Sequence, residues 1–219
     1  MTKIDYRLNA LVDGGLADIA TLPELAAVAA MNGATIIQYR DKTASTRHMI
    51  EQARLIAGAL NSMGVPLVIN DRVDVALASG ADGVHLGADD MDAETARALL
   101  GPDAIIGLTV KNAADAERAA KAPIDYACIG GVFETISKVN PDAPVGIEGF
   151  TALRQFLRTA KPDLAVGAIA GITVERVPFV VAAGADGVAV ISAIFRAVNI
   201  AAATREFRQA VDAALEARR

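Results

Sequence analysis

Two aspartates stand where short apolar runs of the chain end, and they give the first indication of chemistry. Asp71 follows the run 67–69, and Asp90 follows the run 83–86. If both runs are strands of a parallel α/β sheet, their carboxyl ends lie side by side at one mouth of the fold. Mg²⁺ prefers one or two carboxylates together with substrate phosphate oxygens, so the pair predicts a magnesium site. The neighbouring Asp89 competes with Asp90 for this role, and spacing alone does not choose between them.

Each aspartate taken alone has a simpler explanation, because both precede predicted helices and aspartate is a common helix cap. The other reactive side chains do not offer a convincing general base. His85 lies inside an apolar strand end, where we expect a packed and hydrogen-bonded ring, and His48 is expected on an exposed helix face. Cys128 reads as a small core residue. This inventory favours chemistry driven by charge stabilisation and activation of a leaving group.

Strand-like and helix-like segments alternate along the whole chain and position these residues. The predicted strands cover 7–12, 35–39, 67–69, 83–86, 104–108, 126–129, 165–169 and 187–191. The predicted helices cover 23–31, 46–61, 73–79, 92–100, 113–121, 149–159, 174–183 and 200–217. The strands are apolar throughout, as strands buried on both faces are. The segments 80–84 and 184–188 are nearly identical joints between a helix and a strand, which is typical of repeated βα units. We therefore expect one (β/α)₈ barrel domain over 1–219, with an open doubly wound sheet as the alternative.

A barrel would gather the polar residues that follow the strands on one face. Besides the aspartates these are Gln38, Arg40, Lys42, Asn70, Thr109, Thr135, Ser137, Lys138, Gly171 and Ser192. The segment 133–148 has no periodicity, and a loop of that length commonly binds or covers a ligand.

Two groups of these residues suggest anion binding. Gly171 and Ser192 follow the last two strands, where this fold commonly binds phosphate, although Gly171 would also serve a plain tight turn. Arg40, Lys42 and Lys138 form a second positive group that could hold a pyrophosphate together with Mg²⁺. For the lysines the alternative is an ordinary solvated surface charge.

Composition limits the partners and the compartment. The chain has 219 residues, 53% of them hydrophobic, and a net charge of −5, which disfavours a general nucleic-acid binder. The first 13 residues lack the pattern of a signal peptide, and no apolar run reaches membrane-spanning length. The single cysteine cannot form an intrachain disulfide, which fits a reducing compartment. We expect a cytoplasmic protein that binds neither nucleic acid nor membrane.

Several blocks of sequence together resemble the thiamine phosphate synthase (thiamine-phosphate pyrophosphorylase) family. These blocks are 38–42, 69–74, 83–87, Asp90, 130–133 with 135–138, 168–173 and 190–194, in the family's order and spacing over nearly the whole chain. The resemblance implies a (β/α)₈ barrel that condenses 4-amino-2-methyl-5-(diphosphooxymethyl)pyrimidine with a hydroxyethylthiazole-type phosphate. The products would be thiamine monophosphate and pyrophosphate, with Mg²⁺ required. Ala170 departs from the pattern, since a glycine often stands there, and Ser137 replaces a second threonine.

The resemblance also implies a role for each matching residue. The pyrimidine diphosphate would be bound by Gln38, Tyr39, Arg40, Asp41, Lys42 and Asn70, with Thr109 near the pyrimidine and Lys138 on the diphosphate. The thiazole phosphate would be held by Thr135, Ile136, Ser137, Gly171, Ile191 and Ser192. Asp71 and Asp90 would bind Mg²⁺, and Arg40, Lys42 and Lys138 would be the catalytic cations. Pyrophosphate would leave first, and the thiazole nitrogen would capture the resulting pyrimidine cation, a step that needs no strong base.

Two other functions fit parts of this pattern. A thiazole tautomerase relative would use the same barrel without a diphosphate site, so the retained Arg40, Lys42, Asp71, Asp90 and Lys138 argue against it. A non-catalytic sensor of a phosphorylated ligand would need only Gly171 and Ser192 and would leave the acidic pair unexplained. The family resemblance also allows a homo-oligomer, which the sequence does not decide.

Overall fold

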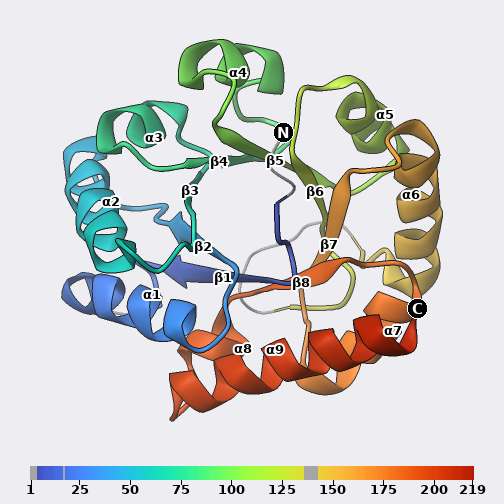
Figure 1. Ribbon diagram of the computed structural model, residues 1–219. Coiled ribbons are helices and arrows are strands. Elements are labelled where there is room, and N and C mark those ends of the chain that lie inside the picture. The colour runs from blue at the N-terminus through green and yellow to red at the C-terminus, as the bar shows by residue number, and fades with distance from the viewer. Residues whose placement is uncertain (1–3, 17, 136–142) are drawn as a thin grey trace.

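The centre of the molecule is a closed barrel of eight parallel strands, paired in chain order from β1 to β8 with β8 returning to β1 (Figure 1). The computed structural model describes residues 4–16, 18–135 and 143–219. The strands are β1 (Leu8–Asp13), β2 (Ile36–Arg40), β3 (Leu67–Asn70), β4 (Gly83–Leu86), β5 (Ile105–Val110), β6 (Tyr126–Ile129), β7 (Ala165–Ile169) and β8 (Gly187–Val190). The predicted (β/α)₈ barrel is confirmed, and the open sheet is wrong because β1 and β8 pair and leave no free edge.

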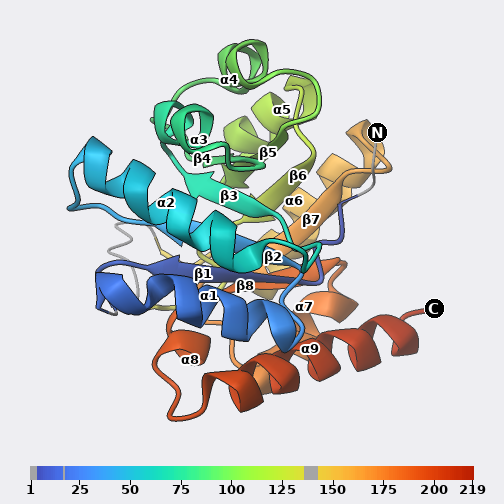
Figure 2. The same cartoon turned by 60° about the vertical axis from the view of Figure 1, so that its left-hand side comes forward.

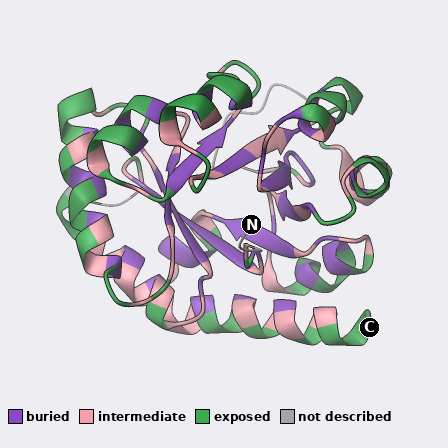
Figure 3. Cartoon of the chain, turned by 45° about the horizontal axis from the view of Figure 1, so that its top comes forward, coloured by how far each residue is buried: buried purple, intermediate pink, exposed green. Residues whose placement is uncertain are grey.

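Helices surround the barrel and cover its outer face. They are α1 (Leu22–Met31), α2 (Thr46–Leu60), α3 (Val73–Ser79), α4 (Ala93–Leu100), α5 (Ala113–Lys121), α6 (Gly146–Ala160), α7 (Val177–Ala182), α8 (Ser192–Phe195) and α9 (Ile200–Ala217), with 3₁₀ turns at Ile19–Thr21 and Val174–Arg176. The long helix α9 closes the ring by lying beside α1 and α7 (Figure 2). The strands are buried on both faces, whereas the helices turn exposed residues outward (Figure 3).

Local sequence explains most of the helix boundaries. The side chain of Ser45 accepts a hydrogen bond from the backbone of α2, and Asp92 does the same for α4, so each residue caps its helix. The predicted helix 174–183 is divided into a 3₁₀ turn and α7. Pro178 stands in the first turn of α7, where its missing N–H is tolerated but where a helix cannot continue from the preceding turn. Among the described residues, no helix is long and apolar enough to cross a membrane.

Every second strand residue points to the barrel axis. Along β2 this inward row is Ile36, Gln38 and Arg40, so the axis is apolar at the amino-terminal end, then carries an amide, and then a cation at the carboxyl end. The alternate residues, such as Ile37 and Tyr39, belong to the hydrophobic layer between barrel and helices. The strands were expected to look apolar throughout, and this holds for the outer row but not for the inner one.

Two tyrosines fill the amino-terminal end of the barrel. The rings of Tyr6 and Tyr126 lie 4.8 Å apart, and both side chains are buried. They fit because the strands beside them carry glycine: a Cβ at Gly167 would lie 1.8 Å from the ring of Tyr6, and one at Gly107 would lie 2.0 Å from that of Tyr126. Tyr6 and Tyr126 together form a tyrosine plug at this end. The carboxyl end of the strands is therefore the accessible mouth of the barrel.

We expect Gly167→Ala to lower the free energy of unfolding by roughly 1–3 kcal/mol, because the added methyl group forces the Tyr6 ring out of its place. Gly58→Ala is the matched control, since a Cβ at this exposed position of α2 meets nothing within 4 Å. It should stabilise the protein by about 0.5–1 kcal/mol through helix propensity. Denaturant unfolding of the two variants checks this expectation, and equal effects would contradict the packing role of Gly167.

Candidate active site

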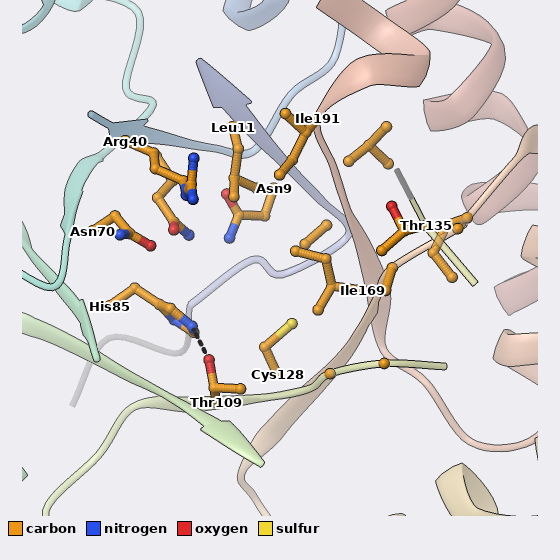
Figure 4. Close-up of a pocket in the computed structure, with 18 of the residues that line it drawn as sticks. Asn9, Leu11, Arg40, Asn70, His85, Thr109, Cys128, Thr135, Ile169 and Ile191 are labelled. Atoms are coloured by element: carbon orange, nitrogen blue, oxygen red, sulfur yellow. Dashed lines mark hydrogen bonds between the residues drawn. The ribbon is translucent and has the colours of Figure 1, made fainter. Parts of the chain in front are cut away.

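A cavity opens at the carboxyl ends of the strands (Figure 4). The predicted site residues that line it are Gln38, Arg40, Asn70, Thr109, Thr135, Gly171, Ile191 and Ser192. Figure 4 shows the side chains of Arg40, Asn70 and His85 on one side of the cavity, a hydrogen bond between His85 and Thr109 below them, and Thr135 on the opposite side. Residues from all eight strands or the segments after them contribute to the lining. The barrel therefore gathers residues that are as far apart in sequence as β2 and α8.

Asp71 and Asp90 come together at the rim beside this cavity. Their carboxyl groups are close enough to hydrogen-bond to each other, and Lys42 forms an ion pair with Asp71. Backbone contacts hold both acids in place, since the Asp71 N–H donates to the His85 carbonyl at 2.7 Å and the Gly87 N–H donates to Asp90 Oδ2 at 2.7 Å. The adjacent Asp89 is exposed. The pair is thus Asp71 with Asp90.

The two carboxyl groups are driven to different protonation states. Burial and the hydrogen bond with Asp71 raise the pKa of Asp90 to about 6. Burial also opposes ionisation of Asp71, but the ammonium of Lys42 and the hydrogen bond with Asp90 outweigh it and hold the pKa of Asp71 below its usual value. Two acids held this close together form a site of concentrated negative potential, which a cation would stabilise.

Helix capping does not account for either aspartate. The residue at the cap of α3 is Arg72, and the cap of α4 is Asp92. Asp71 has a φ of +65°, a left-handed conformation that costs a non-glycine residue about 1–2 kcal/mol and that aspartate tolerates better than most. A strained backbone that aims a carboxylate at a cavity rim is typical of functional sites.

Arg40 is oriented by a residue that the sequence analysis missed. Its guanidinium forms an ion pair with Asp13, the last residue of β1, which is only 5% exposed. Asp13 also accepts the Gly15 N–H at 2.8 Å, so the carboxylate itself is held by its own turn. The sequence did carry a signal for this role of Asp13. Asp13 is the last residue of an apolar strand, and Asp71, which was selected, comes directly after one.

Three of the described residues that were predicted to bind substrate, Tyr39, Asp41 and Lys42, do not line the cavity. The ring of Tyr39 is fully buried in the layer between the barrel and the helices. The carboxylate of Asp41 accepts the backbone N–H groups of Thr43 and Ala44, both at 2.8 Å. Asp41 therefore shapes the loop that carries the exposed Lys42, and neither side chain presents a polar group to the cavity.

His85 connects the cavity wall to the tyrosine plug. One ring nitrogen lies 3.0 Å from the hydroxyl of Tyr126, and the other lies 2.9 Å from the hydroxyl of Thr109. The ring also stacks on Tyr126. The expectation of a packed, hydrogen-bonded histidine is confirmed. Thr109 lies within β5 and not after it, because this strand continues two residues beyond the predicted end to Val110.

The segments after β6 and β7 are joined at the opposite side of the mouth. The N–H groups of Val132 and Phe133 donate to the carbonyls of Ile169 and Ala170, both at 3.2 Å. A Cβ at Gly171 would lie 2.3 Å from the carbonyl oxygen of Glu134, and its φ is +63°, so this glycine serves both a turn and a close approach.

Arg176 locks this junction of the β6 and β7 segments from outside. Its side chain donates to the Gly171 carbonyl at 2.6 Å and stacks on Phe133 at 4.4 Å. The Gly171 carbonyl is therefore engaged by the arginine.

Three predicted residues, Ile136, Ser137 and Lys138, lie outside the described residues. Conversely, the cavity is lined by residues that were not selected from sequence. They are Asn9, Leu11, Lys111, Gly130, Gly131, Ile169, Ala170, Ile172, Ala189, Val190 and Ala193, together with His85 and Cys128, which were expected only to pack. A polar residue inside an apolar strand, as Asn9 is, was the available signal.

Comparisons with known proteins agree with one another. A sequence model of the family described as "Thiamine monophosphate synthase" matches residues 8–194. The chain is 76% identical to a thiamine-phosphate synthase of Agrobacterium fabrum over 100% of this chain and 99% of that protein. It is 40% identical to one of Chloroflexus aurantiacus over 97% and 96% of the two chains. Among solved structures, a thiamine phosphate pyrophosphorylase from Pyrococcus furiosus superposes with a TM-score of 0.83 and 34% identity, covering 98% of this chain and 100% of that one.

We expect Ala170→Gly to stabilise the protein, because Ala170 has a φ of +86°. Relief of the left-handed strain is worth about 1–2 kcal/mol, and the greater freedom of glycine in the unfolded chain offsets about 0.4–1 kcal/mol of it. Thermal unfolding should show a net gain, whereas Ala213→Gly on the exposed face of α9 should destabilise by about 1 kcal/mol. A loss at Ala170 of the size seen at Ala213 would contradict the strain.

Proposed function

The chain belongs to the thiamine monophosphate synthase family and is a transferase that makes thiamine phosphate, and from this we propose how its residues divide the work. We propose that Lys42, Asp71 and Asp90 bind the diphosphate of the pyrimidine substrate together with Mg²⁺, while the β6–β8 side of the mouth binds the thiazole phosphate. The single observation that carries this assignment is the acidic pair with its lysine at the rim.

The acidic pair fits a magnesium ion. Two carboxyl groups within hydrogen-bond reach of each other offer oxygen ligands on the same side, and a divalent cation would relieve their mutual repulsion. Mg²⁺ is commonly bound by one or two carboxylates, with water and substrate phosphate supplying the other ligands. Among the described residues no group of three or more acidic, histidine or cysteine side chains gathers, so this pair is the best candidate. When bound, the ion would neutralise the charge that develops on the leaving diphosphate.

The side chains of the chain would promote departure of pyrophosphate by charge. Lys42 is half exposed on a flexible stem and would exchange its contact with Asp71 for the diphosphate. Arg40, held by Asp13, would contact the same group from the cavity wall. Lys138 would add a third cation, as the family resemblance implies. The pyrimidine cation left behind would be captured by the thiazole nitrogen without a general base, which agrees with His85 being engaged in hydrogen bonds.

The thiazole phosphate would lie at the β6–β8 side of the mouth. Gly171 permits a close approach of the backbone, and Thr135 and Ser192 line the cavity beside it. The mouth of a barrel after its seventh and eighth strands is a common phosphate site. This arrangement would place the two phosphorylated substrates on opposite sides of one cavity, with their reactive ends between them.

Pyrophosphate release tests the activity and the metal separately. With both substrates and Mg²⁺ we expect stoichiometric pyrophosphate and thiamine monophosphate, and with EDTA we expect neither. Release that is unaffected by EDTA would overturn the metal proposal and leave the activity intact. Without release under any condition, the tautomerase or sensor alternatives would have to replace the synthase.

Asp71→Asn and Asp90→Asn should each lower kcat/KM by about a hundredfold or more and raise the Mg²⁺ concentration needed for half activity. Asparagine suits the left-handed backbone of Asp71, so the fold should be kept. Asp89→Asn is the matched control, because this exposed neighbour lies outside the pair and should leave both quantities unchanged. Equal losses in all three variants would show that the effect is local charge and not metal ligation.

Compartment and assembly remain proposals that rest on sequence. We infer a cytoplasmic enzyme that acts on small phosphorylated molecules, supported by the single cysteine, which fits a reducing compartment. A homo-oligomer is compatible with the exposed apolar side chains on α2 and α3, Leu55 and Leu77.

A further inference from the structure

The deep part of the cavity contains two carboxamide oxygens that have no hydrogen-bond partner. Asn9 and Gln38 are 0% and 2% exposed, and both line the cavity. No group in residues 4–16, 18–135 or 143–219 donates to Asn9 Oδ1 or to Gln38 Oε1. A buried acceptor without a donor destabilises a protein, so such atoms are rare unless a ligand completes them. Two of them in one cavity indicate a ligand with N–H donors.

The two amides are neighbours on the inner face of the barrel. Asn9 stands beside Ile36 in the pairing of β1 with β2, and Gln38 is two residues further along the same inward row. Figure 4 shows the amide of Asn9 turned toward the space between Arg40, Asn70 and His85. Both oxygens therefore approach a ligand from the same side of the cavity, below the charged rim.

The amide nitrogen of Asn9 lies on the side of the amide that faces Tyr6. This nitrogen donates to the hydroxyl of Tyr6 at 3.5 Å, and Tyr6 is itself held in the plug against Tyr126. This contact engages the donor side of Asn9 inside the barrel and leaves the acceptor side for the cavity. The cavity is therefore offered the acceptor atom Asn9 Oδ1.

The surroundings of the two amides are neutral. Leu11, Ile169 and Ala189 line the same depth, and burial raises the pKa of the Cys128 thiol to about 12, so it stays protonated. The cations Arg40 and Lys111 lie further out, at the ends of their strands. Such a wall suits a flat uncharged heterocycle, whereas a carboxylate or phosphate would be repelled by the two acceptor oxygens.

We propose that Asn9 is a specificity-determining residue that accepts one N–H of the exocyclic amine of the pyrimidine substrate. The proposal rests on the proposed function and deepens it. A single carboxamide pairs with an amino group and the adjacent ring nitrogen, as asparagine or glutamine does with adenine. Gln38 fits that pairing, which uses only one of the two amine hydrogens. The second hydrogen needs a separate acceptor, and Asn9 Oδ1 supplies it.

A cycle of enzyme and substrate variants tests this proposal. The two pyrimidines are the aminopyrimidine diphosphate and an analogue with hydrogen in place of the amine. For Asn9→Leu we expect kcat/KM with the amino substrate to fall about ten- to a hundredfold, and the affinity for the analogue, measured as a competitive inhibitor, to change less than threefold. The KM for the thiazole phosphate should stay the same. Equal losses with both pyrimidines would overturn the proposal, because they would indicate a merely structural role.

Two further variants control for folding and for loss of an amide. Asn9→Ser is smaller than asparagine, cannot overpack, and should show the same selective loss. Gln52→Leu also removes a buried amide whose oxygen lacks a partner, but Gln52 lies on α2 outside the cavity, so the preference for the amine should persist. A loss of preference in Gln52→Leu as large as that in Asn9→Leu would overturn the proposal.

The same assay separates this proposal from the proposed function. If the unmodified enzyme releases no pyrophosphate from the aminopyrimidine diphosphate, the proposed function fails and takes the role of Asn9 with it. If the unmodified enzyme turns over but binds the analogue as tightly as the amino substrate, only the role of Asn9 is overturned.

Discussion

The alternation of side chains along a closed parallel barrel is the constraint from which the rest of the structure follows. Every second residue of each strand faces the axis, and parallel pairing brings all eight carboxyl ends to one mouth. Tyr6 and Tyr126 fill the other end, where Gly167 and Gly107 make room for their rings. The cavity therefore has a closed floor and a single opening. Polarity changes along the axis from rings, through amides, to charges at the rim.

The rim holds two acids close together, which costs stability unless a cation balances their charge. Asp71 occupies a left-handed backbone and faces Asp90, an arrangement that costs stability until a cation joins it. Lys42 supplies a cation in the free protein, and a metal with a diphosphate would supply more charge in the complex. Each of these charged groups is held by a second contact. The carboxylate of Asp13 pairs with the guanidinium of Arg40, and the backbone N–H of Gly87 donates to the carboxyl group of Asp90. A site built this way stabilises a leaving anion and needs no strong base.

Much of this organisation could be predicted, because local signals were strong where the chain changes direction. The caps Ser45 and Asp92 and the apolar runs placed most strands and helices within a residue or two. The prediction failed where a local signal was ambiguous. Pro178 restarts a helix that looked continuous, and β5 extends through Thr109 because pairing with β6 continues there. The family resemblance selected Tyr39 together with the rest of the segment 38–42. Side chains alternate along β2, however, and this alternation turns the Tyr39 ring away from the cavity.

The sequence by itself determined the family, the order of the eight βα units and the set of strand ends that meet at the mouth. These depend on short-range patterns and on ordered blocks, and both are written along the chain. The family resemblance already favoured Asp90 over Asp89, and the tertiary structure shows its contact with Asp71. Tertiary structure alone decided that Asp13 holds Arg40 and that Asn9 keeps an open acceptor. Both involve residues of neighbouring strands or of the plug, and both depend on which way a side chain points. Contact across a barrel depends on strand register and side-chain packing, and neither can be read from a single position of the sequence.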